Sequence, residues 1–338
     1  MHIHKRTITI GILALLVLGV GMFLYIKKSR SDIGITPDST TIDTEDNDLL
    51  ELVDKALQTN TSIASIPLEK ILDGGPGKDG IPALTNPKFV SVKESRKDID
   101  GDVDGMVVTV GDTTKFYPFS IMVWHEIVND VIDDRSIVVT FCPLCGSSIA
   151  FESNTNGEKE LFGVSGKLYE SNLLMYDQST ESLWSQSTGT AVVGDRTGEK
   201  LAIYNSQLMS FDEFKAKWPD GQVLSIDTGH DRNYSFYPYR NYNENEKIYF
   251  PISVNDNRLP VKELMYVVNA YGKSVAFPVK QLSDSLESVT VDDRQITATL
   301  LDNEIIVTDD TGNILPGYHE MWFSWATQHQ DDGIVWQK

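Results

Sequence analysis

An internal repeat restricts the possible folds of this chain more than any other feature. Residues 111–141 resemble residues 271–300, and residues 209–223 match residues 321–335 at constant spacing. Each copy contains an aromatic residue followed by proline, at Tyr117-Pro118 and Phe277-Pro278. Each also contains an Asp-Asp-Arg-x-Ile turn, which begins at Asp133 in the first copy and at Asp292 in the second. Such self-similarity indicates a duplicated structural unit. We predict a β-rich α+β fold of two pseudo-repeated lobes, a first lobe over residues 61–230 and a degenerate second lobe over residues 231–338.

Local patterns place strands and short helices within these lobes. Residues 106–110 and 136–141 are rich in β-branched side chains and predict strands, and a further strand is expected from Gly146 onward. Pro118 suits the first position of a helix, and the spacing of the apolar residues after it extends that helix to about residue 132. A second helix is expected over residues 210–218.

The N-terminal 30 residues predict a membrane anchor. Residues 7–26 are uncharged, and a helix of this length spans about 30 Å, the thickness of the hydrocarbon core. A cleaved signal peptide is the alternative, but its apolar region is usually shorter and ends at small residues. We expect an uncleaved single-pass anchor with the C-terminal domain outside the cytoplasm. Residues 31–60 form an acidic linker, with eight acids and no base between residues 31 and 54.

The charge of the chain limits its partners. The formal net charge is −20, and residues 1–30 contribute five of the 29 bases and none of the 49 acids. The remainder is therefore strongly acidic and repels phosphate backbones, so we expect no nucleic-acid partner. A surface of this kind is usually a solvated, self-repelling one.

Cys142 and Cys145 are the two cysteines of the chain, in the segment CPLCG. A C-x-x-C pair leaving a strand has three interpretations. It can bind a transition metal such as zinc or copper, although no second cysteine pair completes a zinc ribbon. It can be a redox-active pair, or a structural disulfide in an oxidising compartment. Spacing alone leaves all three open.

A polar cluster precedes the cysteine strand. His125, Glu126, Asn129 and Asp130 fall on the predicted helix, where residues four apart share a face. His125 is the candidate third metal ligand or proton carrier, and Glu126 is a candidate catalytic acid or base. Asn129 and Asp130 are expected to support them.

Later segments offer weaker candidates. Trp184 and Gln186 lie in a run of hydroxyl and amide residues that can line a polar, cofactor-binding pocket, although a strand with one core tryptophan explains the pattern equally well. His319, Glu320 and His329 are further candidates near the C-terminus.

These motifs together resemble a known family. The segments DGGPGKDGIPAL, FYPFSIMVWHEIVND, VTFCPLCGSSIAFE, FGVSGKLYESNLLMYDQSTESLWSQSTGTAVVG and MWFSWATQH resemble domain-of-unknown-function family 3179 over roughly residues 65–330. The resemblance implies a bacterial or archaeal protein that is secreted or membrane-tethered. It also implies that the CPLCG and HExxND segments are family features. The family pattern has His-Pro where this chain has His329-Gln330.

The sequence therefore supports two functional hypotheses. The first is a metal-binding or thiol-redox site at Cys142 and Cys145 with His125 and Glu126. The second is a non-enzymatic cell-surface binding module in which the two cysteines form a structural disulfide.

Overall fold

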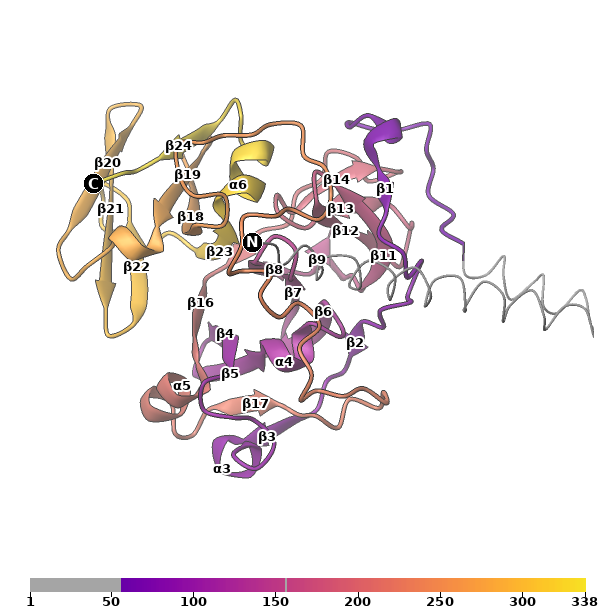
Figure 1. Cartoon of the computed structure of the whole chain (residues 1–338), viewed down its shortest axis with the longest axis horizontal. Coiled ribbons are helices and arrows are strands. Elements are labelled where there is room, and N and C mark those ends of the chain that lie inside the picture. Colours follow the sequence, from indigo (N-terminus) through magenta and orange to yellow (C-terminus); the bar gives the residue numbers. More distant parts are fainter. Residues whose placement is uncertain (1–55, 156) are drawn as a thin grey trace, which may run out of the picture. The chain divides into compact units, whose positions relative to one another are not determined.

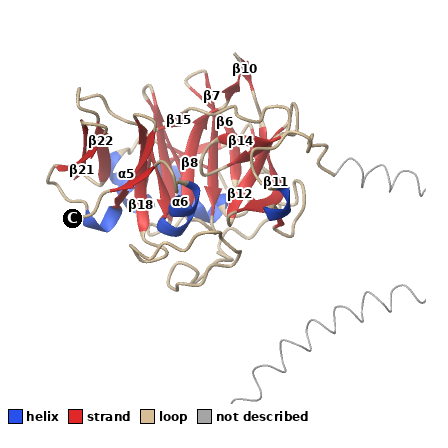
Figure 2. Ribbon diagram, turned by 90° about the horizontal axis from the view of Figure 1, so that it is seen from above, coloured by secondary structure: helices blue, strands red, loops and turns tan. Residues whose placement is uncertain are grey.

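The computed structural model describes residues 56–155 and 157–338, and β-strands provide most of its regular structure (Figures 1 and 2). In these residues no helix is long and apolar enough to cross a membrane. The predicted anchor at residues 7–26 and most of the acidic linker lie outside the described residues. Residues 56–155 and 157–338 belong to one compact unit.

The first half of that unit contains a sheet with the order β16-β4-β5-β17-β3. β4 (Asp104–Val110) and β5 (Thr113–Pro118) form an antiparallel hairpin. β16 (Ser206–Ser210) pairs with the free edge of β4, and α5 (Phe211–Lys217) leads to β17 (Gln222–Leu224), which runs parallel to β5. β3 (Phe89–Ser91) closes the edge.

The second half repeats this arrangement. β18 (Leu264–Ala270) and β19 (Lys273–Pro278) form the hairpin. β23 (Gly317–Met321) pairs with β18, and α6 (Trp322–Gln328) leads to β24 (Gly333–Val335), which runs parallel to β19. The strand order β23-β18-β19-β24 matches β16-β4-β5-β17 element for element. The repeat read from the sequence is therefore visible in the strand topology.

A three-stranded antiparallel meander follows the hairpin in each half. It comprises β6 (Ile127–Ile132), β7 (Arg135–Cys142) and β8 (Ser147–Glu152) in the first half. It comprises β20 (Glu287–Val291), β21 (Arg294–Leu301) and β22 (Glu304–Thr308) in the second. β8 also pairs with β23, where Ser148 lies opposite His319. The predicted lobes thus share one nine-stranded sheet.

The helix expected over residues 118–132 is wrong for most of its length. α4 covers only Phe119–Met122, and β6 begins at Ile127. Glu126 between them has a φ of 58°, a left-handed conformation that ends helical hydrogen bonding. The apolar spacing misled because this segment is rich in β-branched residues, which pack well in a strand, and β6 pairs with β7 along its whole length.

Five further strands form a sheet beside the meander of the first half (Figure 1). They are β1 (Leu72–Asp73), β11 (Phe162–Tyr169), β12 (Asn172–Asp177), β13 (Leu183–Ser185) and β14 (Thr190–Val193). The remaining elements are η1 (Leu68–Lys70), β2 (Leu84–Thr85), α3 (Val92–Ser95), β9 (Asn154–Thr155), β10 (Glu158–Lys159), β15 (Ile203–Tyr204) and η2 (Val279–Gln281).

Residues 225–263 connect the two halves without a helix or strand. This long segment is tied to the first half by several hydrogen bonds. Trp124 Nε1 donates to the carbonyl of Phe236, and the Tyr242 hydroxyl, fully buried, donates to the carbonyl of Leu144 at 2.9 Å. Long ordered loops of this kind are frequently functional. We call residues 225–263 the connecting segment.

Candidate functional site

The two cysteines lie at the turn between β7 and β8. Cys142 is the last residue of β7, and the Cys145 amide donates to the Cys142 carbonyl to close the turn. Gly146 follows with a φ of 56°, and a Cβ there would come within 2.9 Å of the Met321 side chain. The turn therefore needs glycine at this position. Strand β8 begins at Ser147, as the sequence predicted.

Both cysteines are free thiols and both are buried. Their sulfur atoms lie 3.1 Å apart, and the exposed fractions are 2% for Cys142 and 0% for Cys145. A disulfide bond measures about 2.05 Å, so the pair is reduced but adjacent. The structural disulfide of the second hypothesis is not formed in this structure.

The two thiols differ in acidity. Burial by itself raises the pKa of Cys142, but hydrogen bonds from the Cys145 thiol and from the backbone N–H groups of Leu173, Cys145 and Leu144 outweigh it and lower that pKa. Burial raises the pKa of Cys145 well above its usual value, and the charges of Cys142 and Glu320 raise it further. Cys142 is therefore the more acidic thiol of the pair, and Cys145 the less acidic one.

Glu126 places a carboxyl group beside this pair. It occupies the left-handed turn before β6, and its carbonyl accepts the amide of Phe141, the neighbour of Cys142. The residue is buried, with an exposed fraction of 9%. Burial raises the pKa of Glu126 well above its usual value, and the charge of Cys142 raises it further. Glu126 is thus a buried acid that is sensitive to the Cys142 thiolate.

His125 points to other partners. Its Nδ1 lies 2.8 Å from the Pro82 carbonyl, which can only accept, so Nδ1 carries the proton. Its Nε2 accepts from the Tyr234 hydroxyl at 2.7 Å. Burial lowers the pKa of His125 to about 4, so the ring is neutral. With both nitrogens occupied, His125 holds the connecting segment against the first half.

Asn129 and Asp130 have structural partners. Both lie on β6, where neighbouring side chains point to opposite faces, so neither shares a helix face with His125 or Glu126. Asn129 bonds both backbone groups of Phe162 at 2.8 Å and fixes β6 to β11. Asp130 is paired with Lys115 at 2.8 Å and accepts from the Tyr117 hydroxyl at 2.7 Å. These partners occupy the side chains that we expected to support the site.

The predicted metal set is not assembled. Across residues 56–155 and 157–338, no group of three or more His, Cys, Asp or Glu side chains is arranged to hold a metal ion. Cys142 and Cys145 present two sulfurs, and His125, the expected third ligand, has no free ring nitrogen. The residues present do not fit a zinc or copper centre that needs a third protein ligand.

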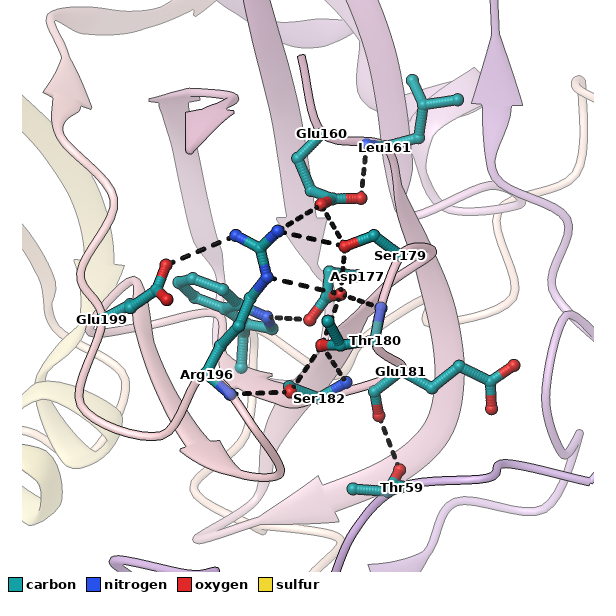
Figure 3. Close-up of polar contacts among 11 residues, drawn as sticks. Thr59, Glu160, Leu161, Asp177, Ser179, Thr180, Glu181, Ser182, Arg196 and Glu199 are labelled. Carbon is teal, nitrogen blue, oxygen red and sulfur yellow. Dashed lines mark hydrogen bonds and ion pairs between the residues drawn. The ribbon is translucent and has the colours of Figure 1, made fainter. Parts of the chain in front are cut away.

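Gln186 and Trp184 have different roles. Gln186 lies behind the cysteine turn, where its amide accepts from Ser147 at 2.6 Å and donates to Thr140 at 2.9 Å. Trp184 donates through Nε1 to Asp177 at 2.8 Å. Asp177 belongs to the ion-pair cluster around Arg196 that Figure 3 shows, which also includes Glu160 and Glu199. Gln186 therefore adjoins the cysteine site, and Trp184 helps to close the β12–β13 turn.

The structure adds residues that the sequence did not single out. Asn172, at the start of β12, directs its amide toward Cys145 Sγ at 3.4 Å and to Gln186 at 2.9 Å. The Ser171 carbonyl lies 3.1 Å from Cys145 Sγ and is a second acceptor within reach of the single Cys145 thiol proton. A positive φ at both Glu170 and Ser171 makes the tight turn that positions these groups. Asparagine in a β hairpin is a common residue, so the sequence held no signal for this role.

The second half contributes Glu320. Its Oε1 accepts from the hydroxyls of Ser187 and Ser324, both at 2.6 Å. Its Oε2 is buried without a hydrogen-bond partner among the described residues, and burial raises the pKa of this carboxyl. The neighbouring Met321 amide donates to the Cys145 carbonyl at 2.9 Å. The cysteine turn thus contacts both halves of the repeat. His329, another of the C-terminal candidates, pairs instead with Asp332 at 3.0 Å.

Comparison with family models identifies the family of this chain. Residues 78–314 match the model described as "Protein of unknown function (DUF3179)". The chain belongs to the DUF3179 family. No curated protein and no solved structure matches it. Within the DUF3179 match lie Glu126, Cys142, Cys145 and Asn172, whereas Glu320 lies beyond its C-terminal limit.

Proposed function

We propose that this protein carries a thiol–disulfide redox site made of Cys142 and Cys145. The observation that carries the proposal is the pair of reduced sulfurs 3.1 Å apart with opposite shifts in pKa. A nucleophilic thiolate and a protonated partner within reach are what two-step disulfide exchange requires. Glu126, a buried acid that responds to the charge of Cys142, supports the assignment.

The proposed reaction balances as a two-electron exchange. The Cys142 thiolate attacks one sulfur of a disulfide R–S–S–R′, forms a Cys142–S–R bond and releases R′S⁻, which takes the proton of Glu126. The Glu126 carboxylate then accepts the proton of Cys145. The Cys145 thiolate attacks Cys142 Sγ, which closes the Cys142–Cys145 disulfide and releases RS⁻. The protein is oxidised, and the substrate disulfide is reduced to the thiol R′SH and the thiolate RS⁻, which takes a proton from the solvent.

The test uses the purified protein and Cys145→Ser. The reduced protein is exposed to diamide, a small thiol oxidant, and then alkylated with iodoacetamide under denaturing conditions. Mass spectrometry should find two adducts before oxidation and none after it. Cys145→Ser should instead stop at a mixed disulfide on Cys142 after treatment with dimethyl disulfide. Persistence of two adducts in the oxidised wild type would overturn the proposal.

We also propose that residues 7–26 anchor this domain at a membrane, with the domain outside the cytoplasm. The support is a run of twenty uncharged residues followed by Lys27 and Lys28. Membrane fractionation of the full chain tests the anchor. Protease added to intact cells should digest the domain, and a protected domain would reverse the orientation.

A further inference from the structure

The second step of the proposed exchange requires a thiolate at Cys145, in surroundings that oppose one. Cys145 is 0% exposed, so water does not reach its sulfur to stabilise a negative charge. The Ser171 carbonyl oxygen lies 3.1 Å from that sulfur, and its partial negative charge repels an anion. A thiolate can form here only if a hydrogen-bond donor of the protein points at Cys145 Sγ.

The side chain of Asn172 provides a donor at this sulfur. Asn172 is the first residue of β12 and is 1% exposed, and its Nδ2 lies 3.4 Å from Cys145 Sγ. A neutral thiol is a weak acceptor, whereas a thiolate accepts a stronger, charge-assisted hydrogen bond. The contact between Asn172 and Cys145 therefore strengthens as the thiol loses its proton, and this hydrogen bond lowers the pKa of Cys145 against the effect of burial.

The neighbours of Asn172 fix the orientation of its amide group. The Ser187 backbone N–H donates to Asn172 Oδ1 at 3.0 Å, and a backbone N–H can only donate. Asn172 Nδ2 donates to Gln186 Oε1 at 2.9 Å. Because Nδ2 carries two N–H bonds, the second one is left for Cys145 Sγ.

Gln186 is oriented in turn by the two strands of the cysteine hairpin. The Thr140 hydroxyl donates to the Ile149 carbonyl at 2.9 Å, so the Thr140 oxygen is left to accept from Gln186 Nε2, also at 2.9 Å. The Ser147 hydroxyl donates to Gln186 Oε1 at 2.6 Å. Gln186 Oε1 therefore faces Asn172 as an acceptor, and the side chains form one consistent hydrogen-bond network.

Strand β23 of the second half holds both sides of the contact between Asn172 and Cys145. The Met321 amide donates to the Cys145 carbonyl at 2.9 Å. Glu320, 0% exposed, accepts from the Ser187 hydroxyl at 2.6 Å, and the Ser187 N–H is the donor to Asn172 Oδ1. The donor and the sulfur are thus anchored to adjacent residues of one strand, which restricts their relative movement.

We infer that Asn172 is a catalytic residue of the second exchange step, in which its Nδ2–H group stabilises the Cys145 thiolate while that thiolate attacks Cys142 Sγ. Gln186 and Ser187 are positioning residues that act through Asn172. This inference rests on the proposed function. Asn172 transfers no proton: the Cys145 proton goes to the Glu126 carboxylate, the bond between Cys145 and Cys142 forms, and RS⁻ leaves with the electron pair of the bond that breaks.

The test follows the second step alone. The reduced protein is treated with dimethyl disulfide at acidic pH, where Cys145 keeps its proton, to form the methyl mixed disulfide on Cys142. The reagent is removed, the pH is raised to a series of values, and quenched samples are analysed by mass spectrometry for loss of the methylthio group. In the mixed disulfide Cys142 carries no charge, which removes one of the causes that raise the pKa of Cys145.

Asn172→Asp keeps the shape of the side chain but replaces the donor with an oxygen. At neutral pH the second step should slow by about ten- to a hundredfold, the contribution of one hydrogen bond to a charged group. The rate should also rise at higher pH than in the wild type, because Cys145 loses its proton later. Asn129→Asp is the matched control, since Asn129 is also 1% exposed but bonds the backbone of Phe162, and it should change neither the rate nor its pH profile.

Gln186→Met provides a second variant if Asn172→Asp does not fold. It removes the oxygen that accepts from Asn172, so it should slow the step by a smaller factor and shift the pH profile in the same direction. A pH profile that stays in place in whichever of these variants folds would overturn the inference and leave the redox function intact, because misplaced groups alone lower the rate without moving the profile. Failure of the wild type to form the mixed disulfide, or to close it, would instead refute the redox function.

Discussion

Strands β7 and β8 of the first half correspond to strands β21 and β22 of the second half, but the turns that connect them differ. β7 and β21 each contain eight residues, begin with arginine after an Asp-Asp turn and pair with the next strand. β21 ends at Leu301, 53% exposed, and passes into β22 through a two-residue turn at Asp302 and Asn303. β7 ends at Cys142, 2% exposed, and passes into β8 through residues 143–146.

The difference shows how a duplicated scaffold acquires a site. In the second half the meander β20-β21-β22 forms a sheet of its own, so its turn remains at the surface. In the first half β8 pairs with β23, which buries the longer turn between the two halves. Burial and surrounding backbone donors then separate the acidities of Cys142 and Cys145. A change of turn length and neighbours, with the strands retained, therefore places two buried thiols in different surroundings.

The largest effect is expected from substituting Glu126, which has no acidic counterpart at the aligned position of the second half. Glu126→Gln keeps the shape of the side chain but removes its proton transfer, so the rate of oxidation by dimethyl disulfide should fall by about a hundredfold. Asp284→Asn, in the exposed counterpart segment of the second half, is the control and should leave the rate unchanged. Rates are measured by quenched alkylation. Similar rates in the two variants would remove Glu126 from the mechanism.

The pH dependence of stability provides a second test of Glu126. The pKa of Glu126 in the folded state lies well above its ordinary value of 4.5, so the folded protein holds the proton more tightly than the unfolded chain. The resulting stabilisation is complete below pH 4.5 and is lost as the pH rises through the folded-state pKa. The difference in unfolding free energy between wild type and Glu126→Gln, from urea titrations, should therefore move against the wild type with rising pH. A constant difference would contradict the raised pKa.

Gly146 in the first half and Gly312 in the second half both have a positive φ, so substituting each by alanine compares the two sites. Gly146→Ala imposes a left-handed conformation on alanine and brings its Cβ within 2.9 Å of Met321, so it should destabilise the protein by about 1–3 kcal/mol. Gly312→Ala, with a φ of 84° and nothing within 4 Å, should be milder because the backbone strain acts alone. Urea unfolding measures both. A larger loss at Gly312 would show that contact with Met321 is unimportant.

The smallest effect is expected from substituting Tyr242, whose hydroxyl donates to the carbonyl of Leu144 in the cysteine turn. Tyr242→Phe removes the buried hydrogen bond to the Leu144 carbonyl and should cost about 1 kcal/mol, with faster alkylation of the native thiols. Tyr271→Phe removes an exposed hydrogen bond to Asp310 in the second half and should have a smaller effect on stability and none on alkylation. Unchanged alkylation in Tyr242→Phe would show that this contact does not guard the site.

The cysteine region was more predictable from sequence than the polar cluster before it. β7 and β8 are flanked by clear turn residues and rich in apolar and aromatic side chains, so their positions followed from local pattern. Residues 119–132 carried an apolar spacing that fits a helix, yet the pairing of β6 with β7 and β2 made most of it a strand or turn. That pairing assigned Asn129 and Asp130 to structural partners and left Glu126 beside the cysteines.

The sequence by itself determined the duplication, the membership of CPLCG in a strand-turn-strand unit and the resemblance to the DUF3179 family, because these depend on local composition and spacing. Only the tertiary structure decided which groups surround the sulfurs. Asn172, Tyr242 and Glu320 reach the cysteine turn from distant parts of the chain. Their proximity depends on sheet pairing and on the course of the connecting segment, which local sequence does not encode. The acidity of each cysteine likewise comes from burial and donors that exist only in the folded protein.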